Sequence, residues 1–336
     1  MMRVNANLRL SSVLSMDTMV EVHILDPYRL SKGTKPFYRS RIREVVWLLR
    51  RVLKKRKAPN TEFLLSIHDC IQTVNTKHHY RGATYVESRP IFSIVRCSFS
   101  DNIPFPMWEG GDLRGGGFDG WDRKMKGFRA QDSVPWKSKI PKAVFRGGNR
   151  PSMYFAKKAD ADMSCNEVGR TRLAYIAKRN PHLYDVSVGG KCGGRLSIMD
   201  RMEAVDQQKF KYILYTEGNC FWADRINMQV FGPSAVIKQE TPCGQFWEPL
   251  LQPMVHFVPT DFFLRNTTNQ LVWAQNHDED VRNIVANANE FASNFVSLRG
   301  IESYVEVLLE QYTKLLNHKD EIKLEVGAEE PRGRYP

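Results

Sequence analysis

Short apolar runs alternate with amphipathic, helix-type segments between residues 142 and 259. The strand-type runs are KAVF, LYDVSV, KYILYT, SAVIK and VHFVP, and the helix-type segments are EVGRTRLAYIAKR, SIMDRMEAVDQQ and WADRINMQVF. This alternation predicts a parallel sheet covered by helices, because parallel strands need long crossover connections. Such sheets bind ligands outside the carboxyl ends of their strands. The sequence therefore predicts an α/β fold with a ligand site at that edge.

The first 140 residues predict a second α/β half. RIREVVWLLRRVLKKRK, residues 41–57, has apolar residues at helical spacing and predicts an amphipathic helix. EFLLSI and PIFSIVRCSF predict strands, and the Gly- and Trp-rich stretch 104–122 predicts a long loop or the wall of a cleft. With 336 residues the chain is long enough for two domains, and we expect them to meet near residue 140.

The C-terminal part predicts two or three helices between residues 268 and 318, and a loose polar tail after Lys319. Two apolar faces are expected to be buried. They comprise Val281, Ile284, Val285, Ala288 and Phe291 on one helix, and Tyr304, Val307, Leu308, Gln311, Tyr312 and Leu315 on another.

The chain is basic, with 49 Lys and Arg against 37 Asp and Glu and a net charge of +12. Such a charge attracts anionic partners, including nucleic acid, a membrane surface or a phosphorylated small molecule. Between residues 29 and 57 there are many basic residues and one acid, Glu44. The helical spacing there favours a solvated basic face, and polyanion binding is the alternative. No apolar run reaches the roughly 18 residues that a membrane-spanning helix needs.

The cysteine and histidine patterns predict no metal site. The six cysteines contain no C-x-x-C pair, which argues against a zinc knuckle or a thioredoxin-type motif. His78 and His79 are adjacent in a polar stretch, where neighbouring side chains usually diverge.

VFRGGN is the first candidate phosphate site. The strand is expected to end at Phe145, and Gly147 and Gly148 after Arg146 would let backbone N–H groups approach a ligand. The next helix brings Arg170 and Arg172. The alternative is an ordinary glycine turn with a surface arginine.

YILYTEGNCFWADR is the second candidate. Gly218 and Asn219 follow a strand, and the expected helix has Trp222 in its first turn and Arg225 in its second. A phosphate bound at a helix N-terminus would use this arrangement. A plain strand-to-helix connection with an exposed arginine is equally compatible with the sequence.

Asp101 is the third candidate, because it follows a strand and precedes Pro104 and Pro106, which stiffen the segment. A carboxylate in this position can act as a general base, or it can stabilise a turn through its own backbone.

Taken in order, these motifs resemble one family. Asp101, VFRGG, KYILYTEGN with its following arginine, and HFVP occur in the order seen in glycosyltransferase family 90, which includes the Rumi-type protein O-glucosyltransferases, KDEL-containing relatives and capsule-associated xylosyltransferases. The resemblance covers about residues 60–316.

The resemblance implies a GT-B fold, in which two Rossmann-like domains face each other across a donor-binding cleft. Residues 1–140 would form the acceptor-side domain with the base and 141–300 the UDP-sugar-binding domain. A C-terminal helix, 301–318, would pack back, before a loose tail at 319–336. The implied reaction is an inverting, metal-independent transfer of a glucosyl or xylosyl unit from a UDP-sugar co-substrate, without a further cofactor.

Site residues follow from the same resemblance. Asp101 matches the catalytic base. Matches to donor-binding residues are Arg146, Gly147, Gly148, Arg170, Gly218, Asn219, Arg225 and His256. Gln245 stands where many relatives have a glutamate associated with the ribose, with Glu248 nearby, and Gln208 replaces a cysteine, so one family disulfide is absent.

The partners implied are a UDP-sugar donor and a protein or glycan acceptor, in the lumen of the endoplasmic reticulum or Golgi. No signal or anchor is visible at the N-terminus of the sequence. Two alternatives stay open: a polyanion or nucleic-acid binding module that uses residues 29–57, and a catalytically inert member of the family.

Overall fold

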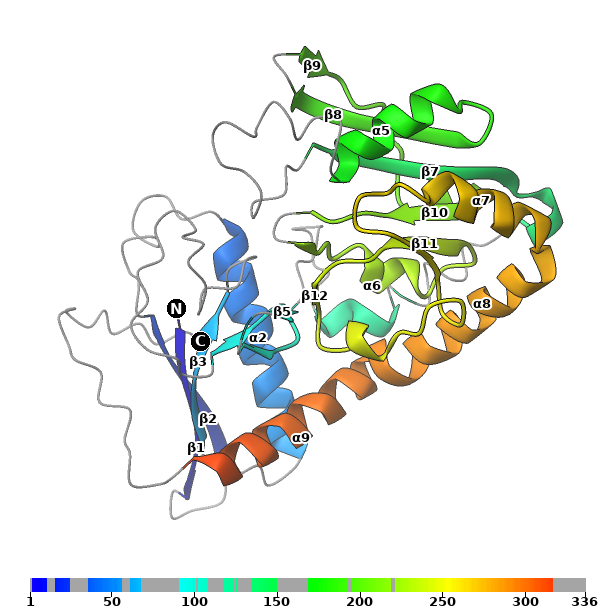
Figure 1. Cartoon of the computed structure of the whole chain (residues 1–336). Coiled ribbons are helices and arrows are strands. Elements are labelled where there is room, and N and C mark those ends of the chain that lie inside the picture. Colours follow the sequence, from blue (N-terminus) through cyan, green and yellow to red (C-terminus); the bar gives the residue numbers. More distant parts are fainter. Residues whose placement is uncertain are drawn as a thin grey trace.

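Two β-sheets lie side by side in the computed structural model, and helices pack around them (Figure 1). The structure describes residues 2–10, 16–24, 36–55, 61–67, 91–98, 100, 102–107, 118–123, 125, 134–149, 169–192, 195–218 and 221–316. The α/β class predicted from the alternating pattern is confirmed.

The larger sheet has six strands in the order β13-β11-β10-β7-β8-β9. Its strands are β7 (Ile140–Gly148), β8 (Tyr184–Cys192), β9 (Arg195–Ser197), β10 (Phe210–Tyr215), β11 (Ala235–Gln239) and β13 (Val258–Thr260). All neighbouring pairs are parallel except β8 with β9. The parallel strands confirm the runs predicted between residues 142 and 259.

One face of this sheet packs against three helices: α5 (Gly169–Arg179), α7 (Thr267–Asn276) and α8 (Asp278–Phe291). Phe145, Tyr212 and Ile237 from the sheet share an apolar core with Leu173 of α5 and Ile284 of α8. The period of 3.6 residues places the apolar side chains of each helix on one side, and burial of that side stabilises the helix.

Two helices predicted in this half are wrong in extent. Residues 198–205 are irregular and lead into a short 3-10 turn (Asp206–Lys209), because β9 and Asp200 are fixed to the edge of the sheet. The expected helix at 222–231 is reduced to α6 (Ile226–Gln229). Phe221 has a φ of 66° and the Ala223 N–H donates to the Tyr215 hydroxyl, so these residues cannot continue a helix.

The smaller sheet has five strands in the order β2-β1-β3-β4-β6. They are β1 (Met2–Leu10), β2 (Met16–Ile24), β3 (Thr61–Ser66), β4 (Phe92–Ser93) and β6 (Ile103–Pro104). β1 pairs with β2 and β3 in antiparallel fashion, whereas β3, β4 and β6 are parallel. The sheet is therefore mixed, and its β1–β2 hairpin is not among the predicted elements.

The helix predicted at 41–57 is confirmed as α2 (Pro36–Lys55). Its buried apolar residues are Ile42, Val45, Leu48, Leu49, Val52 and Leu53. The prediction that its basic side lies wholly in water is wrong for Arg41, which is 1% exposed and donates to the backbone oxygen of Ile67.

A two-stranded ladder joins the two halves. β5 (Arg96–Cys97) pairs with β12 (Cys243–Gly244), and a disulfide links Cys97 to Cys243. The single strand predicted for 90–99 is thus two short strands, because β4 pairs within the smaller sheet and β5 with β12.

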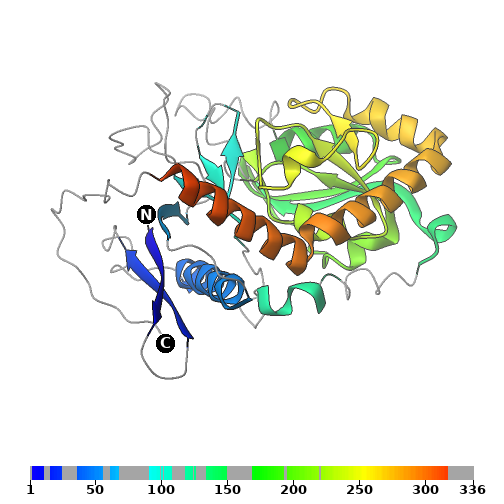
Figure 2. The ribbon, with the colours of Figure 1, turned by 90° about the horizontal axis from the view of Figure 1, so that it is seen from below.

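The last described helix, α9 (Leu298–Leu315), extends from the larger half to the smaller one. It follows α8 through a π-helical turn (Ala292–Val296) and lies against α2 (Figure 2). Three helices in the predicted region are therefore confirmed. The apolar side predicted for the last one is confirmed for Tyr312, which is buried, and in part for Tyr304 and Leu308, which pack against the core. It is wrong for Val307 and Leu315, which are 55% and 81% exposed. Ile301, Val305 and Leu309 are the buried residues, on the side where Glu302 pairs with α2.

Two valines on α9 test this orientation. Val305 is fully buried and Val307 is exposed, although both have the same side chain. We expect Val305→Ala to lower the free energy of unfolding by about 1–3 kcal/mol, because it leaves a cavity, and Val307→Ala to change it by less than about 0.5 kcal/mol. Urea unfolding of both variants measures the difference. Equal effects would contradict the burial of this side of α9.

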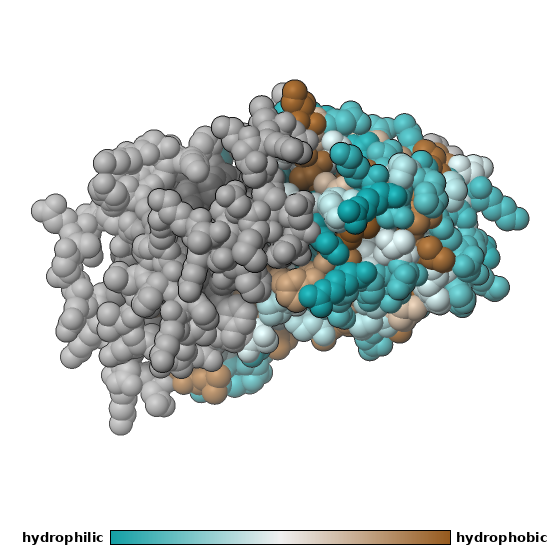
Figure 3. Space-filling model, turned by 45° about the horizontal axis from the view of Figure 1, so that its top comes forward, coloured by the Kyte–Doolittle hydropathy of each residue, from teal (hydrophilic) through white to brown (hydrophobic). Residues whose placement is uncertain are grey.

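The surface of the larger half is mostly hydrophilic on the side seen in Figure 3, with scattered hydrophobic residues. No helix within the described residues is both long and apolar enough to cross a membrane. The same residues contain no group of three or more His, Cys, Asp or Glu side chains able to hold a metal ion.

Candidate functional site

Two arginines meet at the carboxyl edge of the larger sheet. β7 and β10 are neighbouring parallel strands, so Gly147 and Gly148 at the end of β7 share this edge with residues 216–218 after β10. Arg170 comes from the start of α5, and Arg225 immediately precedes α6. Both guanidinium groups lie over the ring of Phe145, with Cζ at 5.5 Å and 4.8 Å from its centre.

Arg225 is fixed against the end of β7. Its Nη1 donates to the backbone oxygen of Arg146 at 2.8 Å. A Cβ at position 147 would lie 3.2 Å from Nη2 of Arg225 and 3.0 Å from the Phe145 ring. Gly147 therefore permits the close approach of the guanidinium group to the strand. The glycines lie within β7, so the prediction that the strand ends at Phe145 and turns is wrong.

Arg170 bridges the ends of β7 and β10. Its Nη1 donates to the Gly148 oxygen at 2.9 Å, and its Nε donates to the Glu217 oxygen at 3.0 Å. A Cβ at position 218 would lie 2.7 Å from the Trp222 oxygen and 3.3 Å from Nη2 of Arg170. Gly218 is thus required by the packing of the loop and the arginine, and a side chain there would displace both.

Arg225 donates a hydrogen bond to a backbone oxygen, and no Asp or Glu in the described part of the chain forms an ion pair with it. Burial lowers the pKa of Arg225, while Asp224 and Tyr215 act in the opposite direction. An arginine stays charged at neutral pH despite such a shift. This edge of the sheet consequently has a positive charge that an anionic ligand could neutralise.

Arg146 is placed differently from the other two arginines. Side chains alternate along a strand, so Arg146 and Phe145 point to opposite faces of the sheet. Arg146 is 6% exposed and forms ion pairs with Asp185 at 2.7 Å and Asp200 at 3.2 Å. Its charge is compensated within the fold, and a role as a donor ligand stays a prediction.

Gln245 lies in a buried polar network. Its Oε1 accepts a hydrogen bond from Nδ2 of Asn227 at 3.0 Å, and its backbone N–H donates to Glu248 at 3.0 Å. The Gln245 Nε2 has no hydrogen-bond partner, and Glu248 pairs with Lys238 at 3.4 Å. The nearby carboxylate is therefore already paired, and the ribose contact of Gln245 stays a prediction.

His256 contacts neither arginine. Its Nδ1 accepts a hydrogen bond from the Gln252 N–H at 2.9 Å, and its ring packs on Phe291 at 5.0 Å. Burial lowers the pKa of His256, so the ring is neutral at pH 7. Its contribution to donor binding also stays a prediction.

Asp101 and Asn219 lie outside the described residues, so the structure does not place these two predicted site residues. The neighbours of Asp101 are described. Ser100 and Asn102 are buried on either side of it, and the Ser100 hydroxyl is bonded to the backbone of Cys97 in β5. Ser100 is therefore anchored next to the ladder that joins the two halves.

Glu217 is a site residue that the sequence analysis did not single out. It is fully buried beside Gly218, and neither of its carboxylate oxygens has a hydrogen-bond partner. Burial raises the pKa of Glu217 to about 8, while Arg170 and Gln239 act to lower it. The TEGN motif places Glu217 next to Gly218 in the sequence, which is the one signal that could have indicated it. The burial of its side chain cannot be predicted from this motif.

This shift has a consequence for stability. The folded protein holds a proton on Glu217 between its ordinary pKa of 4.5 and about 8, where the unfolded chain is ionised. The contribution of Glu217 to the free energy of unfolding therefore falls as the pH rises from 4.5 to about 8, and it is constant at higher pH. We expect Glu217→Gln to be more stable relative to the wild type at pH 8 than at pH 5. Urea unfolding at both pH values measures this, and a pH-independent difference would contradict it.

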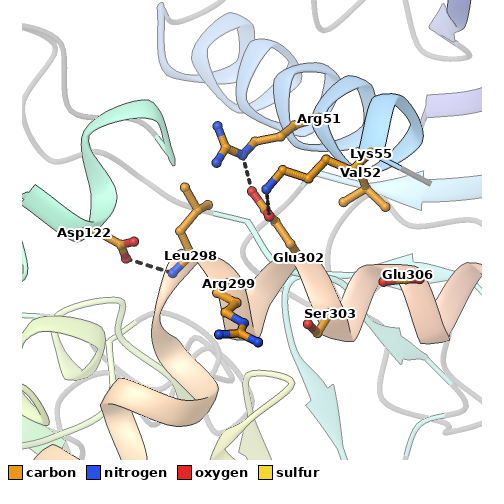
Figure 4. A pocket seen from close by; sticks show the side chains of 9 residues that line it. All are labelled: Arg51, Val52, Lys55, Asp122, Leu298, Arg299, Glu302, Ser303 and Glu306. Carbon is orange, nitrogen blue, oxygen red and sulfur yellow. Dashed lines mark hydrogen bonds and ion pairs between the residues drawn. The ribbon is translucent and has the colours of Figure 1, made fainter.

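The cavity shown in Figure 4 lies elsewhere, between α2 and α9. Its volume is about 300 Å³, and its charged lining residues are Arg51, Lys55, Arg299, Asp122, Glu302 and Glu306. Glu302 pairs with Arg51 and, at 2.6 Å, with Lys55. These basic residues of α2 thus have acidic partners within the fold, which does not favour the polyanion-binding alternative.

Comparisons with known proteins agree with the motif order. The model of the family described as glycosyl transferase family 90 matches residues 28–330. Human protein O-glucosyltransferase 1 is 24% identical over 274 residues, which cover 76% of this chain and 65% of the relative. Protein O-glucosyltransferase 2 of Danio rerio is 23% identical over 275 residues, covering 80% of this chain and 50% of the relative. The chain thus spans 65% or less of these curated relatives.

Among solved structures, the crystal structure of Anabaena HepE in complex with UDP matches with a TM-score of 0.31 and 10% identity, covering 58% of this chain and 52% of that one. A score this low does not establish a shared fold. The family match, in contrast, spans most of the sequence and confirms the resemblance found in its motifs. The chain belongs to glycosyl transferase family 90.

Proposed function

We propose that this protein is an inverting glycosyltransferase that moves a glucosyl or xylosyl unit from a UDP-sugar to a hydroxyl of a protein or glycan. Family membership and the names of its relatives, protein O-glucosyltransferases, support sugar transfer. The observation that carries the proposal is Arg225, a cationic side chain that forms no ion pair with any described carboxylate and lies at the carboxyl edge of parallel strands.

The arginine pair suits a diphosphate leaving group. When the bond between the sugar and the diphosphate breaks, negative charge develops on the phosphate oxygens. Preorganised cations lower the energy of that transition state. Arg225 and Arg170 are held by backbone oxygens and by Phe145, so they need little rearrangement. The N-terminus of α5, where Arg170 lies, adds the positive end of a helix dipole.

Asp101 is proposed as the general base. Its carboxylate would accept the proton of the acceptor hydroxyl while that oxygen bonds to the anomeric carbon. The bond from the anomeric carbon to the diphosphate breaks at the same time, and its electron pair leaves with UDP. Attack on the face opposite the leaving group inverts the configuration.

We place the activity in the lumen of the secretory pathway, as the family resemblance implies. The Cys97–Cys243 disulfide supports this location, because disulfides persist mainly in oxidising compartments. The same bond links β12, which follows β11 of the larger sheet in the chain, to β5, which precedes Asp101.

A donor screen tests the proposal. UDP release would be measured from UDP-glucose, UDP-xylose and UDP-galactose, with and without an added acceptor. We expect release from UDP-glucose or UDP-xylose well above the rate of the Arg225→Ala variant, with UDP-galactose as the comparison donor. Release from neither UDP-glucose nor UDP-xylose, under conditions where the wild type is folded, would overturn the proposal.

UDP is also expected to raise the melting temperature, because it would bind the folded site alone. At a UDP concentration of about 100 times Kd the gain is about 2.7 kcal/mol. Uridine should give a much smaller shift, since it lacks the diphosphate that the arginines would bind. Differential scanning fluorimetry with millimolar UDP, in the presence and absence of EDTA, measures the effect. No shift in either condition would contradict the proposed donor site.

A further inference from the structure

Glu217 lies beside Arg170 at the edge of the sheet and carries a buried carboxyl group. Its side chain is fully buried, and both carboxylate oxygens lack hydrogen-bond partners. Its backbone oxygen accepts from Nε of Arg170 at 3.0 Å, and its backbone N–H donates to Oε1 of Gln239 at 2.9 Å. Burying an ionised carboxylate that accepts no hydrogen bond costs free energy. This cost falls when the carboxylate binds a proton and becomes neutral.

Several described charged groups lie on the elements next to Glu217 in the chain and in the sheet. Arg170, from α5, is the cation that acts on its carboxyl group. Lys238 on β11 is paired with Glu248, and Arg146 on β7 is paired with Asp185 and Asp200. Burial lowers the pKa of Arg225, and Asp224, just before α6, opposes this lowering. Beyond β11, Asp261 accepts hydrogen bonds from backbone N–H groups of its own turn. Arg170 is therefore shared between Glu217 and any anion bound at this edge.

We propose that UDP binding at the Arg170–Arg225 edge is coupled to the uptake of a proton by Glu217, which makes Glu217 a positioning residue for the donor site. The inference rests on the proposed function. An ionised Glu217 would compete with the diphosphate for Arg170 and repel it, whereas a protonated carboxyl is neutral. A bound diphosphate therefore raises the proton affinity of Glu217. The proton comes from the buffer, and no covalent bond other than the carboxyl O–H is formed.

The pH dependence follows from linkage. Because Glu217 titrates near pH 8 in the absence of a ligand, the affinity for UDP should fall as the pH rises from 7 to 9. If bound diphosphate raises the pKa by one unit, the loss is about fivefold over this range. The phosphate of UDP, with a second pKa of about 6, is already ionised at these pH values.

Isothermal titration calorimetry of UDP binding measures the coupling. The titration is carried out at pH 8 in Tris and in HEPES, which differ in ionisation enthalpy, so the difference in heat gives the number of protons exchanged. We expect an uptake of a few tenths of a proton per UDP. The affinity is also measured at pH 7 and pH 9.

Glu217→Gln is the test variant, since it keeps the size of the side chain and removes the titration. This variant should bind UDP without proton uptake. Its affinity for UDP should be the same at pH 7 and pH 9, once the contribution from ionisation of free UDP has been subtracted. Glu240→Gln is the matched control, because Glu240 is exposed one residue beyond β11. This control should keep the proton uptake of the wild type.

The outcomes separate the two proposals. If the wild type does not bind UDP at pH 7, the proposed function fails and this inference fails with it. If the wild type binds UDP with no proton uptake at pH 8, only this inference is overturned. Uptake that persists in Glu217→Gln also overturns it. Should that variant not fold, the two-buffer measurement on the wild type still tests the proposal, because an absence of proton uptake at pH 8 would overturn it.

Discussion

Replacing Asp101 with Asn is expected to lower the transfer rate by about a hundredfold to ten-thousandfold, the usual contribution of a positioned general base. Asn has nearly the same size and keeps the hydrogen bonds that could stabilise a turn, but it cannot accept the acceptor proton. Since the base does not bind the donor, the affinity for UDP should stay near the wild-type value.

Three measurements on this variant separate catalysis from structure: the transfer rate, UDP affinity and the melting temperature. A structural turn residue predicts a small loss of rate that follows a loss of stability. A turnover near that of the wild type would remove Asp101 from the mechanism. Asn102→Ala, next in the chain and buried, is a useful comparison, because it should affect stability more than the chemical step.

Arg225→Ala is expected to weaken UDP binding by about tenfold to a hundredfold, because a charge-assisted contact with the diphosphate is lost. The melting temperature without UDP should change little. The variant loses one hydrogen bond to the Arg146 oxygen, and it also loses a partly buried charge that is not paired with any described carboxylate.

Calorimetry with UDP measures this loss, and Arg201→Ala is the matched control, because Arg201 is an exposed arginine in the same half of the molecule. The control should bind UDP as the wild type does. If Arg225→Ala binds UDP with unchanged affinity, the arginine is a packing residue of the sheet edge, and the proposed donor site lies elsewhere.

Local sequence patterns determined the strands of the larger sheet other than β9. The apolar runs that become β7, β10 and β11 are recognisable because a buried strand needs apolar residues on both faces. Their order also places Arg170 and Arg225 after strands, and the carboxyl ends of parallel strands share an edge. The candidate site could therefore be located from the sequence, as could the helices α2, α5, α7 and α8.

Contacts between distant residues decided the rest, since no local pattern encodes them. α9 has apolar residues on two sides. Its contact with α2 decides that the side with Val305 is buried and the side with Val307 is exposed. The stretch 90–99 is divided between two sheets because Cys97 meets Cys243, 146 residues further along the chain.

At the site, the tertiary structure assigned the charges. Arg146 and Arg225 are both arginines beside strand ends in the sequence, yet Arg146 meets Asp185 and Asp200 while Arg225 meets a backbone oxygen. Glu217 reads as an ordinary turn residue, and only burial without hydrogen-bond partners makes it hold its proton. Sequence thus determined which ionisable groups reach the edge of the sheet, whereas the fold decided which of them keep an unbalanced charge, because charge balance depends on neighbours that are far apart in the chain.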